Sequence, residues 1–289
     1  MEILHILEHS FLDSLKLLPF LFFTYLLMEY LEHRSGNIAE KVLGRSGQLG
    51  ALIGGALGLI PQCGFSSAAA GLYAARVISL GTLISVFLST SDEMIPIFLS
   101  HSISIELIVK ILAIKLTVAI ICGVAIDFIL KALNKSPKTK IEEFCEQEDC
   151  HCHSSIIKPA IIHTLKVGAF ILVFTLLINI AIHFIGEDNI ASFVSINPTL
   201  ASLFSVLVGL IPNCASSIII SELYVSGIIS AGTMLSGLLA NSGVALAVLF
   251  RTNRPRKNSF LIVLILIAIS LLVGVIVDIT PLSQWLTIK

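Results

Sequence analysis

A nine-residue stretch of this chain occurs twice within strongly apolar sequence, and this repetition constrains the fold more than any other feature. The first copy, 58–66, reads Gly-Leu-Ile-Pro-Gln-Cys-Gly-Phe-Ser, and the second, 209–217, reads Gly-Leu-Ile-Pro-Asn-Cys-Ala-Ser-Ser. From Gly58 to Met94, 15 of 37 positions are identical at a fixed offset of 151 residues, against about 6% expected from average composition. The chain is therefore an internal duplication.

The composition predicts an all-α integral membrane protein of the cell membrane. The 289 residues are 56% hydrophobic and only 13% charged, whereas a soluble domain carries about 25% charged residues. Aromatic residues are sparse and no basic face is extensive, so we expect no nucleic-acid partner. The first 13 residues carry three acids and no Lys or Arg, which does not fit a cleavable signal peptide.

Apolar segments of about 20 residues are expected to span the bilayer. Six are present, at 14–31, 80–99, 106–131, 160–185, 228–250 and 259–280. The segments that carry the motif, 49–76 and 199–226, are too long for one plain span and too short for two. We expect each to form a re-entrant hairpin that turns at the motif, because non-helical backbone at membrane depth is tolerated only where protein encloses it.

The distribution of Lys and Arg predicts the orientation, since short cytoplasmic loops are basic. Loops 32–48, 131–158 and 251–258 are basic, whereas 100–105 and 186–198 contain no Lys or Arg. If the N-terminus lies outside and both motif segments are hairpins, every basic loop is cytoplasmic and every loop without Lys or Arg is external.

Two inverted repeats follow, each with three transmembrane helices and one re-entrant hairpin, because an odd number of crossings reverses the second copy. The predicted division is repeat one at 1–133, a cytoplasmic linker at 134–158, and repeat two at 159–289. The alternative is a parallel duplication of four plain spans in each half.

Four interruptions are expected to converge near the bilayer centre. Two are the hairpin turns, where Pro61 and Pro212 break the helices. The others are the break at 89–93 and its counterpart at 240–243. Such breaks present free backbone groups and partial charges. The expected substrate-binding residues are Gln62, Cys63, Ser66, Ser89, Thr90, Ser91, Asp92, Glu93, Asn213, Cys214, Ser217, Asn241 and Ser242. For any single Ser or Thr, close helix packing is the alternative.

The acids at the first break are expected to matter most. A carboxylate inside the membrane costs several kcal/mol and marks a functional site by default. Asp92 and Glu93 have Gly243 and Val244 as counterparts, so the acids are confined to repeat one. This asymmetry suggests a site that binds a cation or exchanges a proton. The alternative is that 92–93 lies near a membrane surface and is solvated.

Three further charged residues fall within apolar segments. Glu222 lies late in the second hairpin and is expected nearer the surface. Lys115 and Lys166 lie inside or near span ends and are expected to snorkel toward water.

The motif cysteines, Cys63 and Cys214, have three interpretations that the sequence leaves open. They could pack as small hydrophobic side chains, bind a soft metal as thiolates, or bind a trivalent arsenical covalently.

The linker contains a second candidate metal site. From 142 to 153 it holds three thiols, two imidazoles and five carboxylates, a composition that suits zinc or another thiophilic metal. The candidate ligands are Cys145, Cys150, His151, Cys152 and His153. An acidic flexible linker is the alternative, since the spacing matches no standard zinc finger.

The duplicated G-L-I-P-[Q/N]-C-[G/A] motif, the S-T-S-D-E break at 89–93 and the Cys/His-rich linker resemble the family of ten-transmembrane heavy-metal exporters. That family is similar to the arsenical permeases, and some members are labelled manganese transporters. The resemblance covers nearly the whole chain, and six spans plus four hairpin arms give its ten membrane segments. It implies metal or metalloid efflux across the cell inner membrane.

The expected function is therefore secondary active efflux of a divalent metal ion such as manganese, with an arsenical or oxyanion permease as the alternative. The chain has no G-x-x-x-x-G-K-[S/T] motif for ATP, so a proton or ion gradient, or an external partner, would supply the energy. An enzyme is not expected, because no His lies beside the motif. We expect no cofactor beyond the transported ion and a linker-bound metal, and the sequence leaves homo-oligomerisation open.

Overall fold

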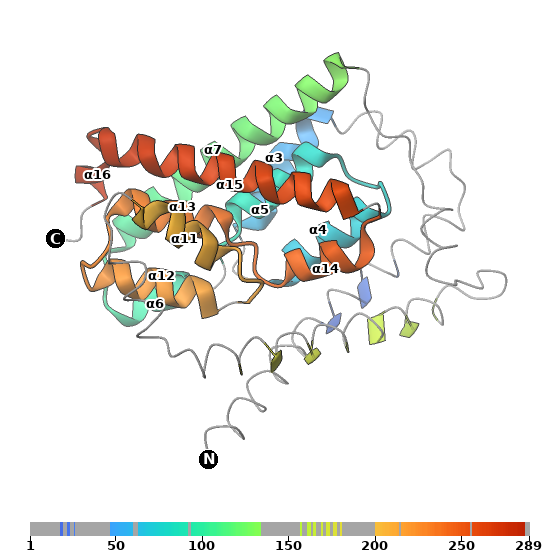
Figure 1. The fold of residues 1–289 in the computed structure, drawn as a ribbon, viewed down its shortest axis with the longest axis horizontal. Coiled ribbons are helices and arrows are strands. Elements are labelled where there is room, and N and C mark those ends of the chain that lie inside the picture. Colours follow the sequence, from blue (N-terminus) through green and yellow to red (C-terminus); the bar gives the residue numbers. More distant parts are fainter. Residues whose placement is uncertain are drawn as a thin grey trace.

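The computed structural model contains only helices in the residues that it describes (Figure 1). The described residues are 47–59, 63–91, 94–133, 200–213, 215–254 and 256–286, with isolated helical positions within 18–26 and 157–180. The predicted all-α class is confirmed in this part of the chain. Of the predicted spans, 14–31 and 160–185 lie outside it except for those isolated positions.

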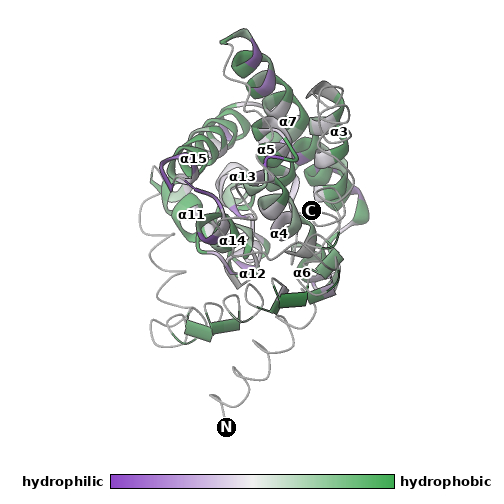
Figure 2. Ribbon diagram, turned by 90° about the vertical axis from the view of Figure 1, so that its right-hand side faces the viewer, coloured by the Kyte–Doolittle hydropathy of each residue, from purple (hydrophilic) through white to green (hydrophobic). Residues whose placement is uncertain are grey.

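Among the described residues, two continuous helices are long and apolar enough to cross a bilayer. These are α7 (Ile105–Ala132) and α15 (Arg256–Ile279), which agree with the predicted spans 106–131 and 259–280. Large apolar side chains such as Phe128 and Leu264 are exposed along them, and both helices are coloured hydrophobic over most of their length in Figure 2. An exposed apolar face of this kind suits contact with lipid.

Two further segments reach spanning length only as pairs of short helices. The first pair is α5 (Leu80–Ser89) and α6 (Met94–Ser100), and the second is α13 (Ala231–Ala240) and α14 (Ala245–Thr252). In the second break, Gly243 has φ of 56°, a left-handed conformation that glycine adopts without steric cost. The interruptions thus fall where the sequence predicted them.

Each motif segment also consists of two short helices that meet at the motif. The first contains α3 (Gly47–Gly58) and α4 (Cys63–Ala74), and the second contains α11 (Ala201–Gly209) and α12 (Ala215–Val225). A helix of 12 residues is about 18 Å long, well short of a hydrocarbon core of about 30 Å. Neither motif segment is therefore a single plain span.

An aspartate binds the N-terminus of each broken span, and the two aspartates are related by the same 151-residue offset as the motif. Asp127 in α7 accepts hydrogen bonds from Ser79 Oγ at 2.6 Å and from the Gly81 main-chain N–H at 2.8 Å. Asp278 in α15 accepts the equivalent pair from a serine and a glycine, at 2.8 and 2.9 Å. The duplication therefore extends well beyond the motif.

Glycines allow these helices to approach at backbone distance. A Cβ atom on Gly81 would collide with the carbonyl oxygen of Gly123 in α7, and one on Gly232 would collide with that of Gly274 in α15. Small residues commonly permit such close crossings between membrane helices. Each broken span is thereby fixed against the continuous helix of its own repeat.

Two helices of the first half of the chain pack against helices of the second half. Helix α4 packs against α14, and α6 packs against α12. Two buried apolar clusters follow from this packing, one joining α4 and α5 to α14 and α15, the other joining α6 to α12 and α13. In Figure 1, α7 and α15 run in opposite directions across the view. The core of each half is therefore completed by the other.

Candidate functional site

The C-terminal ends of the broken helices α5 and α13 meet inside the protein. Lys115, in the middle of α7, contacts both of them through its Nζ. The ammonium donates to the main-chain oxygen of Thr90, the C-cap residue of α5, and to that of Leu238, in the last turn of α13, at 3.1 Å. Helix C-termini carry partial negative charge and unsatisfied carbonyls, so this meeting point stabilises positive charge.

The Lys115 side chain is 0% exposed, so the expectation that it snorkels was wrong. A snorkelling lysine needs a path to water for its head group, whereas the middle of α7 is covered by α5 and the ammonium points to α13. The residue 151 positions later is Leu266, which is equally buried. The sequence signal for a functional role at this position was that repeat one has a lysine where repeat two has a leucine. Lys166 lies outside the described residues.

The first break presents a row of buried hydroxyl groups. Ser89 and Thr90 donate to carbonyl oxygens of the last turn of α5, and Ser91 donates to the Ser89 carbonyl, at 2.7 to 3.0 Å. Each hydroxyl hydrogen is therefore engaged by the helix, while oxygen lone pairs remain as acceptors. Hydroxyls oriented in this way suit a cation better than an anion.

The second break is shaped by its asparagine. The Asn241 side-chain oxygen accepts a hydrogen bond from the Gly243 N–H at 2.8 Å, a local turn that asparagine favours. The neighbouring Ser242 hydroxyl is buried and has no hydrogen-bond partner among the described residues. Of these two predicted ligands, Ser242 is therefore the one whose side chain the local structure leaves available.

The motif helices begin at the motif cysteines. Helix α4 begins at Cys63, and α12 begins one residue after Cys214. Pro212 lies in the turn that follows α11, where it was expected to end the helix. Asn213 is buried, and its main-chain oxygen accepts from Ser216 Oγ at 2.7 Å. The polar residues that follow the motif face the interior.

Several hydroxyls at the start of α4 and α12 are buried. Ser66 and Ser217, which occupy equivalent positions, are each 1% exposed. Ser67 is also buried, and its hydroxyl lacks a hydrogen-bond partner within the described chain. The start of each motif helix therefore carries buried hydroxyl oxygens.

Each motif lies against the broken helix of its own repeat. A Cβ atom on Gly58, the first motif residue, would collide with Ser89 Oγ at the end of α5. A Cβ atom on Gly209 would collide with the Gly237 carbonyl oxygen in α13. Both motif glycines therefore stand where the helix that leads into the motif, α3 or α11, closely approaches the last turns of α5 or α13.

Part of the predicted site lies outside the described residues. These residues are Pro61, Gln62, Asp92, Glu93 and Cys214, the side chain of Cys63, and the linker ligands Cys145, Cys150, His151, Cys152 and His153. Among the described residues, no group of three His, Cys, Asp or Glu side chains could hold a metal ion. The described part of the site is therefore built from hydroxyl, amide and carbonyl oxygens.

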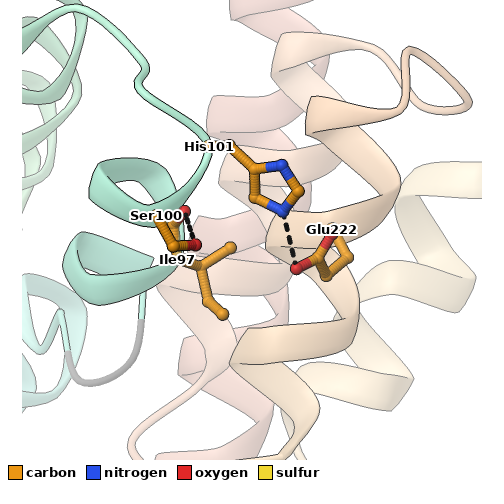
Figure 3. A network of polar contacts seen from close by, with 4 residues as sticks. All are labelled: Ile97, Ser100, His101 and Glu222. Atoms are coloured by element: carbon orange, nitrogen blue, oxygen red, sulfur yellow. Dashed lines mark hydrogen bonds and ion pairs between the residues drawn. The ribbon is translucent and has the colours of Figure 1, made fainter.

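Glu222 lies at an exposed position, outside the buried site at the helix breaks. Its side chain is 42% exposed, and its Oε1 lies 3.0 Å from Nε2 of His101, just beyond the end of α6 (Figure 3). In the same turn, Ser100 donates to the Ile97 carbonyl at 2.8 Å. The half-exposed position agrees with the expectation that Glu222 lies nearer a surface, and the pair joins α6 to α12.

One comparison with known proteins identifies a family. Residues 3–167 and 156–287 match a family described as "Putative, 10TM heavy-metal exporter". The two matched segments overlap and together cover nearly the whole chain. No curated protein and no solved structure matches the chain.

Proposed function

We propose that this chain, which belongs to the family of 10TM heavy-metal exporters, moves divalent metal ions such as manganese out of the cytoplasm by secondary active transport. One observation carries the choice of a cation. The C-terminal ends of α5 and α13 converge on a single buried ammonium, that of Lys115. A site that holds one positive charge with helix carbonyls offers the same stabilisation to another.

The oxygen-rich surroundings support a hard or borderline metal. Hydroxyl and carbonyl oxygens at both breaks are ligands that suit Mn²⁺ and similar ions. Asp92 and Glu93 are the last two residues of the first break, and we propose that they neutralise the bound ion. Gln62 and Asn213 would complete the shell, and Cys63 and Cys214 would raise its affinity for softer metals.

We further propose that the two repeats are inverted and alternate around this site. The opposite directions of α7 and α15, together with the exchange of α4 and α6 between the halves, support such an arrangement. Rocking of inverted repeats about a central site is a common transport mechanism. We propose that the N-terminus lies outside and the linker in the cytoplasm, an orientation that the distribution of basic loops favours.

Orientation is tested by labelling single cysteines introduced at Ser104 and at Arg254, which are both exposed, in a cysteine-free variant. An impermeant maleimide added to intact cells should modify position 104 only. Modification of position 254 alone would reverse the proposed orientation.

Transport is tested in proteoliposomes that contain the purified chain. Vesicles loaded separately with Mn²⁺, Zn²⁺, Cd²⁺ or arsenite are assayed for flux, with and without a pH gradient. We expect protein-dependent flux of at least one divalent ion, and the gradient reports whether protons drive it. Absence of flux for every metal would refute the proposed function.

The acids give a sharper test of the cation site. Replacing Asp92 with Asn and Glu93 with Gln should abolish divalent flux, because the ion would lose its neutralising charges. Glu106→Gln is the matched control, since Glu106 lies on α7 with its side chain 77% exposed and paired to Lys110. If the double variant transports metal as well as the control, the acids do not form the site.

An arsenical or oxyanion permease is the second candidate. It is favoured by the start of α4 at Cys63, because a helix N-terminus offers N–H groups to an anion and the thiol can hold arsenic. Arsenite flux without divalent flux in the same vesicles, unaffected by Asp92→Asn, would select this alternative.

A further inference from the structure

We infer that Lys115 is a resident cation, which occupies the carbonyl site of the unloaded transporter and is displaced by the transported ion. This inference rests on the proposed function and names a role for a residue outside the expected ligand set. Its direct basis is geometric, because one Nζ atom contacts carbonyl oxygens at the ends of two helices from opposite repeats.

Packing alone does not require a positive charge at this position. The equivalent residue in repeat two, Leu266, is also 0% exposed and fills its place as an apolar side chain. A buried ammonium carries a desolvation cost that leucine avoids. The charge is therefore retained for its interactions, and the contacts with the helix carbonyls of Thr90 and Leu238 are among them.

Four of the described helices near the ammonium contain no charged or imidazole side chain. The sequences of α3, α5, α6 and α13 contain no Asp, Glu, His, Lys or Arg. On α7, the nearest such residues are Lys110 and Glu106 on one side and Asp127 on the other, about 7.5, 13.5 and 18 Å along the helix axis from Lys115. Asp92 and Glu93, outside the described residues, follow Thr90 in sequence. The carbonyl dipoles of α5 and α13 thus form the described partners of this charge.

A transporter that releases its ion must return with its site empty of cargo. Two helix C-termini that face each other without a cation would leave their partial negative charges uncompensated. The tethered ammonium compensates them in the unloaded protein, and its flexible four-carbon stem allows it to withdraw when a metal ion takes the carbonyls. Lys115 therefore competes with the ion during loading and replaces it during the return step.

The variant Lys115→Met tests this role in the full-length chain, because Met keeps the length and removes the charge. We expect two changes in detergent-solubilised protein. Apparent Mn²⁺ affinity should rise at least about tenfold, since the competitor no longer reduces the competent fraction. The melting temperature should fall without divalent ions and recover when Mn²⁺ is added. Lys110→Met, on the same helix but 38% exposed, should change neither.

Vesicle transport separates the resident-cation role from a merely structural one. In Lys115→Met, exchange of internal for external Mn²⁺ should persist, whereas net efflux should fall at least about tenfold because the empty return is impaired. Lys115→Arg, which keeps a positive charge, should restore net efflux. A variant that loses exchange and net efflux together, and that Arg does not rescue, would overturn the inference.

The two proposals fail in distinguishable ways. If the wild-type chain moves no metal, the proposed function fails, and the melting experiment still tests the resident cation. If the wild-type chain exports Mn²⁺ and Lys115→Met matches it in affinity, melting temperature and net efflux, the function stands and the inference is refuted.

Discussion

The aspartate that binds the start of each broken span allows a quantitative prediction about stability. Asp127 accepts two hydrogen bonds at the N-terminus of α5, from Ser79 Oγ and the Gly81 N–H. Hydrogen bonds to a charged group contribute about 1.5–3 kcal/mol each, and a carboxylate at a helix N-terminus adds about 0.3–1 kcal/mol. Asp127 is half-buried, so water replaces part of what is lost. We expect Asp127→Ala to cost about 2–3 kcal/mol.

The equivalent aspartate of repeat two, Asp278, provides a matched comparison for the stability effect of Asp127. Asp278 makes the equivalent bonds, but its side chain is exposed. Asp278→Ala should therefore cost less, about 1 kcal/mol, because water competes for an exposed carboxylate. Asp127→Asn should also cost about 1 kcal/mol. The amide oxygen can still accept from the Gly81 N–H, but the charge is lost and the amide nitrogen cannot accept from Ser79 Oγ.

The assay is thermal unfolding of the purified chain in detergent at a fixed scan rate, because unfolding of such proteins is commonly irreversible. At about 2–4 °C per kcal/mol, Asp127→Ala should lower the apparent melting temperature by about 4–12 °C. Glu106→Ala, an exposed acid on α7, serves as the control. The reasoning is refuted if Asp127→Ala melts with the wild type, or if Asp278→Ala is the more destabilised variant.

Three further predictions concern the motif residues and the exposed pair of Glu222 and His101. Gly58→Ala should lower both stability and metal flux, by about 1–3 kcal/mol in a melting assay, because its methyl group would collide with the end of α5; an unchanged melting curve would contradict the close approach. Cys63→Ser with Cys214→Ser should reduce Cd²⁺ flux more than Mn²⁺ flux, since thiolates prefer softer metals; equal effects on both ions would argue for packing. Glu222→Gln should shift stability by less than about 1 kcal/mol, as expected for the exposed pair with His101, and a larger loss in the same melting assay would show that the pair fixes α6 to α12 more strongly.

The interruptions of the helices could be predicted from sequence because their causes are local. A proline beyond the first turn of a helix removes a main-chain hydrogen bond and breaks the helix. A motif segment of intermediate length also fits neither one span nor two. The binding of Asp127 to the start of α5 could also have been predicted from sequence, because the 151-residue offset continues without a gap from Asp127 to Asp278. Its recognition required comparison of the two copies beyond the motif.

The surroundings of Lys115 could not be predicted, because they depend on packing between the repeats. A single lysine in an apolar helix can reach water or remain inside, and the choice depends on which helices cover it. Here α5 covers it, and the last turn of α13 contributes the second carbonyl from the other half of the chain. Likewise, the pairing of α4 with α14 is a tertiary contact that no local pattern encodes.

That pairing has a consequence for how the chain could arise and how it can be divided. Because α14 is covered by α4, and α6 lies against α12, neither half contains all the partners of its own helices. This packing resembles that of a domain-swapped dimer whose two copies are joined in one polypeptide. A single ancestral copy would have needed a second copy to bury the same surfaces. Fragments 1–133 and 159–289 should therefore be stable in membranes only when they are produced together.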